Sequence, residues 1–139
     1  MISFDPDGWL EVAEVCCDTI EGVDAEALLR TALNCAYYAA LLSVKRRIES
    51  VHGRNALPRF RTHAAILDAT QSGGVLFLEI YRSLQALRTM RESADYELRS
   101  EPLHWNAVHS QVRLSRNLIR TRIKALPDAE FRRLVLPRR

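Results

Sequence analysis

Three features of this sequence predict an all-α fold, an antiparallel up-and-down bundle of four to six helices. Apolar residues recur at helical spacing in long segments. Helix start and stop signals separate these segments. No segment shows the alternating pattern and turn residues of a β-hairpin. At 139 residues, with 47% hydrophobic and 27% charged residues, the chain predicts a single domain over residues 1–139, with its core at 5–126 and a basic C-terminal extension at 127–139.

The first two helices are predicted at residues 6–20 and 25–51. Asp5 is a suitable N-cap for the first helix, and Pro6 fits its first position because a proline there loses no hydrogen bond. Asp24 is the N-cap for the second helix, which is the longest. Apolar and small residues recur along it at helical spacing, so we expect it to be the central core helix.

Four more helices are predicted in the rest of the chain. A loop with three arginines, residues 53–61, follows the central helix, and Pro102 starts a fresh helix after a turn. The helices are expected at residues 62–71, 75–91, 103–126 and 129–135.

Several classes of protein are disfavoured by the composition. No uninterrupted apolar run approaches the roughly 18 residues of a membrane span, and the N-terminus lacks the basic and apolar regions of a signal peptide. We therefore expect a cytoplasmic protein without membrane association. The three cysteines fit neither a disulfide framework nor a zinc spacing, and the four histidines show no metal-binding motif. Since no phosphate-cradling glycine loop is present either, we expect no metal and no cofactor.

Charge is distributed unevenly along the chain. Residues 1–29 contain eight acidic residues and no Lys or Arg, whereas residues 103–139 contain nine basic and two acidic residues. This asymmetry suits a polyanion such as RNA, packing of the two ends of the chain against each other, or contact with a partner. Arg113, Arg116 and Arg120 follow one flank of the last long helix. They are candidates for RNA or nucleotide binding, and the alternative is a solvated helix face.

The densest polar constellation lies between Leu87 and Leu98. It contains Arg91, Asp95 and Tyr96 within one and a half helical turns. Such a helix end offers a charged donor, an acceptor and a phenol in one place, which makes it the first candidate for a site.

Together with two other motifs, this constellation resembles the HEPN superfamily. In chain order, the three motifs are Arg30-Thr-Ala-Leu-Asn-Cys-Ala-Tyr-Tyr-Ala-Ala40, Thr62-His63 and Arg91-x-x-Ala-Asp-Tyr96. They occur in the expected order over about residues 24–126. The resemblance implies a helical bundle that usually forms a homodimer, RNA cleavage or nucleotide binding, and membership in toxin–antitoxin or antiviral defence systems.

HEPN ribonucleases typically use Arg-x4-6-His in a metal-independent cleft shared by two subunits. Histidine can move the proton of a ribose 2′-OH near neutral pH, and arginine can stabilise charge on the phosphorane. This chain departs from the pattern because Tyr96 stands five residues after Arg91, and a phenol with a pKa near 10 is a poorer base. An Arg-x4-His match does occur from Arg99 to His104, but it contains a proline.

The resemblance thus implies two sets of site residues. The catalytic candidates are Arg91, Asp95, Tyr96 and His104. The RNA- or nucleotide-binding candidates are Arg30, Tyr37, His63 and Arg99, joined by the three arginines of the last long helix. We expect Arg30, Tyr37 and Arg91 to converge across neighbouring helices. The alternative is a buried network, for instance from Arg30 to Asp95, that only locks the bundle.

Three functions follow from these patterns. The first is a homodimeric HEPN protein that acts on RNA, as a metal-independent endoribonuclease of a toxin or defence system. The second is a non-catalytic helical subunit of a larger ribonucleoprotein, or the partner of a nucleotidyltransferase-type protein. The third is a module that binds a small nucleotide in the bundle cleft.

Overall fold

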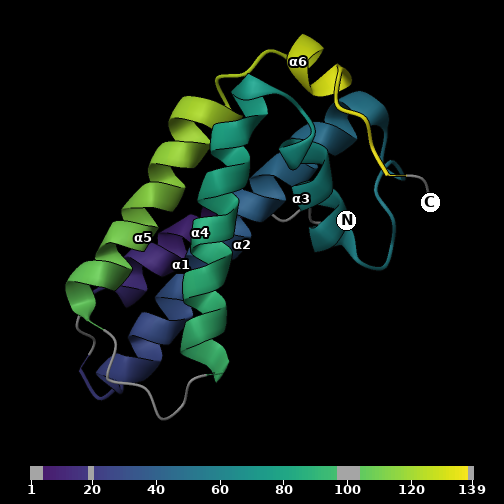
Figure 1. The fold of residues 1–139 in the computed structure, drawn as a ribbon. Helices are drawn as coiled ribbons and strands as arrows, with labels where there is room; N and C mark the ends of the chain where they lie inside the picture. The colour runs from purple at the N-terminus through teal and green to yellow at the C-terminus, as the bar shows by residue number, and fades with distance from the viewer. Residues whose placement is uncertain (1–4, 19–20, 97–103, 138–139) are drawn as a thin grey trace.

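The computed structural model describes residues 5–18, 21–96 and 104–137, and the regular secondary structure of these residues is entirely helical (Figure 1). The side chains of Asp95 and Tyr96 lie outside the described part, although their backbone does not. The all-α prediction is confirmed. The elements are α1 (Pro6–Cys16), α2 (Ala25–His52), α3 (Thr62–Gln71), α4 (Val75–Tyr96), α5 (Trp105–Leu118), the π-helical segment η1 (Ile119–Ile123) and α6 (Asp128–Arg132).

Side-chain caps start the first two helices as predicted. The Asp5 carboxylate accepts a hydrogen bond from the Asp7 amide at 3.0 Å, and the Asp24 carboxylate accepts one from the Glu26 amide at 2.8 Å. Gly53 ends α2 with φ +102°, a conformation that side-chain-bearing residues rarely adopt.

Helix α1 ends at Cys16, earlier than the predicted residue 20. The Cys17 carbonyl is instead bonded by the indole N–H of Trp105, at 2.6 Å. A side chain distant in sequence therefore bonds the Cys17 carbonyl, which the predicted helix 6–20 would have bonded internally. Ile20 lies outside the described residues.

Helix α2 is the central element, because it contacts every other helix in the described part of the chain. Ala32, Ala36, Ala39 and Ala40 have no exposed surface, and such small residues allow neighbouring helices to approach closely. Ser115 of α5 uses this proximity, since its hydroxyl donates to the Ala36 carbonyl at 2.7 Å.

By length and composition alone, α2 could also cross a membrane. It is the one helix among the described residues that meets this criterion, and 67% of its most apolar 18-residue window is buried inside the protein. Burial of that extent is typical of a core helix of a globular fold.

Helices α4 and α5 differ most from their predicted bounds. Helix α4 continues to Tyr96 rather than ending at Arg91, so the whole Arg91-x-x-Ala-Asp-Tyr96 motif is helical. The α-helical part of α5 ends at Leu118 and gives way to η1, where the Lys124 amide bonds the Ile119 carbonyl at 2.9 Å. A π-type turn of this kind is rare in helices and is often found at special positions.

The segment predicted as a C-terminal extension belongs to the core through Leu134. Phe131 has no exposed surface, and its ring meets that of Phe77 edge-on at 5.2 Å. Leu134 packs so close to Gly73 that a Cβ added there would lie 2.6 Å from the Leu134 Cδ2 atom. The core is larger than 5–126 because α6 returns over the end of α2 (Figure 1).

Candidate functional site

Arg91 of α4 lies against two tyrosines of α2. Its Nε donates to the Asn34 side-chain oxygen at 2.7 Å. Its guanidinium carbon lies 5.3 Å from the ring centre of Tyr37 and 5.1 Å from that of Tyr38, within cation–π range of both. Asn34, Tyr37 and Tyr38 are spaced i, i+3 and i+4, so one face of α2 presents all three to α4.

His63 of α3 completes this group. Its ring centre lies 5.9 Å from that of Tyr37 and 5.6 Å from that of Tyr38, both in edge-on contacts. We call Asn34, Tyr37, Tyr38, His63 and Arg91 the Arg91 cluster. It is located where α2, α3 and α4 meet.

Burial and positive charge set the protonation of the cluster. Burial, followed by the charges of Arg91, Arg88 and Lys45, lowers the pKa of His63. The lowered pKa favours the neutral form of its imidazole, which can accept a proton. Burial raises the pKa of Tyr37, against the opposing effect of Arg88 and Arg91.

The Tyr37 hydroxyl is buried and has no hydrogen-bond partner within the described part of the protein. Tyr38, His63 and Arg91 are half-buried and so reach the surface. The cluster thus combines a fixed guanidinium, an imidazole and aromatic rings. These groups suit an anionic ligand such as a phosphate.

The predicted convergence of Tyr37 and Arg91 is observed, whereas Arg30 bonds elsewhere. Arg30 pairs with Glu26, one turn away on α2, at 3.1 Å. Its Nη1 is buried without a hydrogen-bond partner in the described residues. Asn34, one turn further along α2, makes the contact with Arg91 instead.

Four other candidates have no place in the described cluster. Arg99 lies outside the described residues, as do the side chains of Asp95 and Tyr96. An Arg30–Asp95 pair and the Arg99–His104 motif therefore stay predictions. His104 is exposed, and its side chain does not cap the start of α5.

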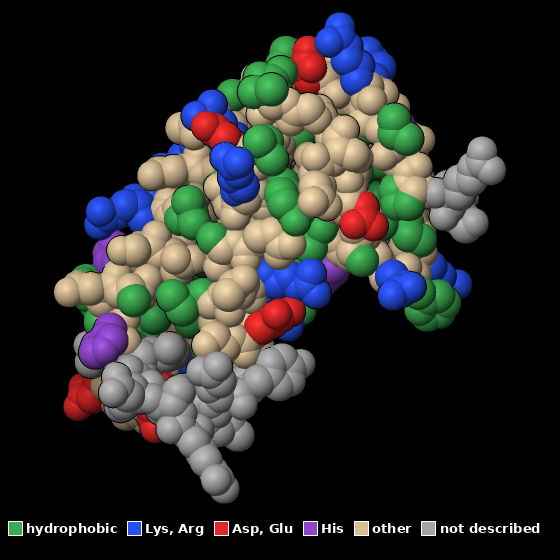
Figure 2. All heavy atoms as spheres, in the orientation of Figure 1, with side chains coloured by type: hydrophobic (Ala, Val, Ile, Leu, Met, Phe, Trp, Pro, Cys, Tyr) green, Lys and Arg blue, Asp and Glu red, His purple; other side chains and the backbone are tan. Residues whose placement is uncertain are grey.

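Part of the basic flank of α5 and η1 faces acidic residues of α1. Arg116 lies 3.7 Å from Glu14, and Lys124 lies 2.7 Å from Asp7. Arg113 and Arg120 are exposed. Basic and acidic side chains are interspersed over the face in Figure 2 rather than gathered in one patch. The uneven charge distribution thus serves, in part, to pack the two ends of the chain together.

Sequence reasoning selected Tyr37, His63 and Arg91 but missed the contributions of Asn34, Tyr38, Arg88 and Lys45. Asn34 and Tyr38 stand in the motif that carries the resemblance, and their spacing from Tyr37 places them on a shared face. The sequence pattern does not show where α4 packs on α2, and that packing decides which face of α2 contacts Arg91.

No protein-family model, curated protein or solved structure matches this chain. The likeness to the HEPN superfamily rests on the three sequence motifs.

Proposed function

We propose that this chain is a HEPN-like protein that acts on RNA through the Arg91 cluster. In this proposal the helices form the antiparallel bundle of that superfamily, two copies form a homodimer, and the protein belongs to a toxin–antitoxin or antiviral system. The single observation that carries the proposal is Arg91 held against the Tyr37 and Tyr38 rings, with the His63 ring in edge-on contact with both.

In this proposal His63 is the proton acceptor, in place of the histidine that the Arg91 motif lacks. In metal-independent cleavage, the imidazole accepts the proton of a ribose 2′-OH, whose oxygen then bonds the adjacent phosphorus. The bond from phosphorus to the 5′-oxygen breaks, and the leaving oxygen takes a proton from water. Arg91 stabilises the negative charge that develops on the phosphoryl oxygens.

Cleavage of a mixed RNA pool in the presence of a chelator tests this function. We expect the wild type to cleave, and Arg91→Ala to lose about 100-fold or more of the rate, since that is the effect of removing one charge-stabilising donor. His63→Gln should lose a similar fraction. Arg82→Ala, which removes an exposed arginine of the same helix, is the matched control and should cleave like the wild type.

Equal cleavage by the wild type and Arg91→Ala would contradict the assignment. Light scattering tests the homodimer separately, because a monomer at assay concentration would exclude a cleft shared by two copies.

A second candidate is a non-catalytic subunit that binds RNA or a protein partner such as a nucleotidyltransferase-type protein. It is favoured by the engagement of Arg91 with Asn34 and both tyrosine rings, which is also how a structural arginine is held. Binding of RNA without any cleavage by the wild type would support this candidate over the enzyme.

A further inference from the structure

The loop between α2 and α3 presents an unusual set of side chains. Residues 53–61 contain three arginines and no acidic residue. Arg54, Arg59 and Arg61 are exposed, and Phe60 is 81% exposed. A large aromatic side chain in water within a basic segment contributes nothing to the core and is available to bind a ligand.

The loop is anchored to the fold. Leu57 is buried, and the Thr62 hydroxyl donates to the Pro58 carbonyl at 2.8 Å. Arg61 adopts a left-handed conformation, φ +60°, which is uncommon for a residue with a side chain. Because its middle is buried and its C-terminal end is bonded to α3, the loop presents Phe60 and the arginines in a defined arrangement.

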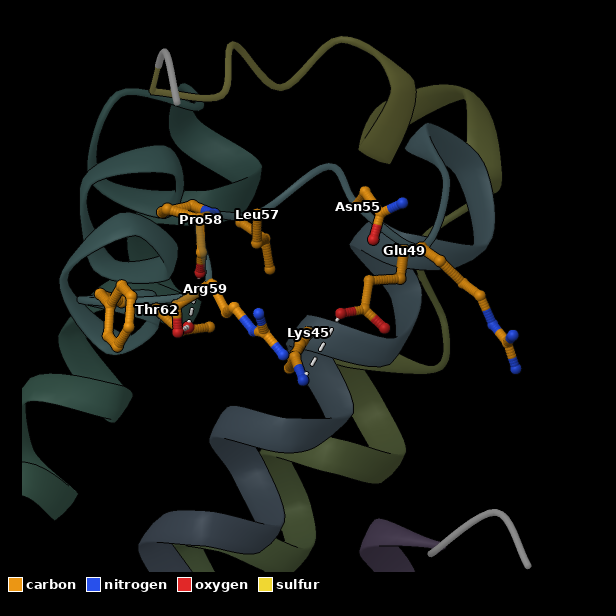
Figure 3. Close-up of a pocket in the computed structure, with 9 residues that line it drawn as sticks. Lys45, Glu49, Asn55, Leu57, Pro58, Arg59 and Thr62 are labelled. Atoms are coloured by element: carbon orange, nitrogen blue, oxygen red, sulfur yellow. Dashed lines mark hydrogen bonds and ion pairs between the residues drawn. The ribbon is translucent and has the colours of Figure 1, made fainter. Parts of the chain in front are cut away.

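A cavity of about 650 Å³ lies between this loop and α2 (Figure 3). Arg59 from the loop and Lys45 from α2 extend into the same opening in Figure 3, and Arg54 and Phe60 also line it. The single acidic residue of the lining is Glu49, which lies 3.5 Å from Lys45. Three cationic side chains against one carboxylate leave the cavity positively charged.

The cavity adjoins the Arg91 cluster. Thr62 lines the cavity and directly precedes His63. Lys45 is close enough to lower the pKa of His63. It follows Tyr38 by two turns of α2, about 10 Å along the helix axis. The cavity and the cluster are thus separate but neighbouring sites, about 10 Å apart along α2.

We propose that this cavity binds single-stranded RNA, with Phe60 stacked on an unpaired base and Lys45, Arg54 and Arg59 on the phosphates. The inference rests on the proposed function and adds its substrate class. Aromatic stacking combined with a positively charged groove is how proteins hold single strands, whereas the bases of a duplex are already stacked on each other and are not offered to a side chain.

Fluorescence anisotropy tests the proposal with labelled RNA of about 12 nucleotides, 2′-O-methylated so that it cannot be cleaved by 2′-OH attack. We expect the wild type to bind the single strand more tightly than a duplex of the same sequence. Phe60→Ala should weaken binding about 5- to 100-fold, the usual effect of losing one stacking side chain, with an unchanged salt slope. Arg59→Gln should weaken binding and reduce the magnitude of the salt slope by about 0.7, which corresponds to one lost phosphate contact.

Two matched controls come from outside the cavity. Val75→Ala removes an equally exposed apolar side chain, and Arg132→Gln removes one exposed positive charge on α6. Both should bind RNA like the wild type, and all four variants should keep the wild-type circular dichroism spectrum.

Each contrary result has a distinct meaning. If the wild type binds or cleaves RNA while Phe60→Ala and Arg59→Gln bind like the wild type, the cavity is not the RNA site and the proposed function stands. Equal affinity for single strand and duplex would overturn the substrate class. If Phe60→Ala changes the oligomeric state but not the RNA affinity, the loop is a contact between protein copies. If the wild type neither binds nor cleaves RNA, the proposed function fails and the inference fails with it.

Discussion

Tyr37 combines complete burial with a hydroxyl that has no hydrogen-bond partner in the described residues. Leaving such a group unsatisfied costs about 1–3 kcal/mol. We therefore predict that Tyr37→Phe raises the free energy of unfolding by about 1 kcal/mol, measured by urea denaturation. A loss of RNA cleavage in this more stable variant would show that the hydroxyl is retained for function.

Tyr81→Phe is the control for that substitution. The Tyr81 hydroxyl accepts a hydrogen bond from Gln85 at 3.1 Å, so its removal should lower the free energy of unfolding by about 0.5–1 kcal/mol. If both variants were destabilised alike, the Tyr37 hydroxyl would have a partner in solution.

His63 predicts a specific dependence of stability on pH. Its pKa in the folded protein is lowered, mainly by burial and then by Arg91 and Arg88, below the value of about 6.5 for an unfolded chain. As the pH falls through 6.5, the unfolded chain takes up a proton that folded His63 does not. The free energy of unfolding should therefore decrease from neutral pH toward pH ~5.5, and this decrease should be smaller in His63→Gln.

Urea denaturation at several pH values measures this effect. His104→Gln changes an exposed histidine and should retain the wild-type pH dependence. An unchanged pH dependence in His63→Gln would show that its imidazole titrates alike in both states.

Arg47 shows how one side chain can join two helical elements. It extends from α2 to the end of η1, where its guanidinium donates to the Ile123 carbonyl at 2.5 Å and the Leu126 carbonyl at 2.6 Å. It also pairs with Asp128 at 2.9 Å and lies 4.4 Å from the ring centre of Phe131. Ile123 is the last residue of η1 and Leu126 lies in the turn that follows, so neither carbonyl is in a position to accept a regular helical hydrogen bond.

We predict that Arg47→Met lowers the free energy of unfolding by about 2–4 kcal/mol, because it leaves part-buried carbonyls without a charged donor. The neighbouring Arg46 is 63% exposed and pairs only loosely with Asp5, at 3.4 Å. Arg46→Met should therefore cost less than about 0.5 kcal/mol. Equal effects of the two substitutions in urea denaturation would contradict the structural role of Arg47.

At the scale of the whole molecule, the C-terminal segment closes one end of the helical core. Phe131 is fully buried against Phe77, whereas Val135 is 79% exposed. We predict that Phe131→Ala lowers the free energy of unfolding by about 3–5 kcal/mol, the usual cost of removing a buried aromatic ring. Val135→Ala should change it by no more than about 0.5 kcal/mol. A small effect of Phe131→Ala would mean that residues after 126 form a separable extension.

Sequence reasoning recovered most of the fold because its signals are local. The caps at Asp5 and Asp24 and the start of α3 at Thr62 were predicted from neighbouring residues and are observed. Two of the errors lie at helix ends where distant groups bond the backbone. Trp105 bonds the carbonyl after α1, and Arg47 bonds carbonyls at and just after the end of η1.

The candidate site was predicted in part for the same reason. Tyr37 and Arg91 converge as expected, and His63 joins them. Arg30 does not, because Glu26 is a closer partner on its own helix. Asn34 bonds Arg91 at a sequence separation of 57 residues, and no local pattern encodes a pair so distant.

The sequence by itself determined that this protein is helical, where most helices start and which helix is central, because helix propensity, capping and apolar periodicity act over a few residues. Only the tertiary structure decided which charges neutralise one another, which histidine lies beside Arg91, and that Phe131 belongs to the core. Those outcomes depend on how α2, α3, α4 and α6 are rotated and packed against one another, and side-chain packing over the whole chain sets that arrangement.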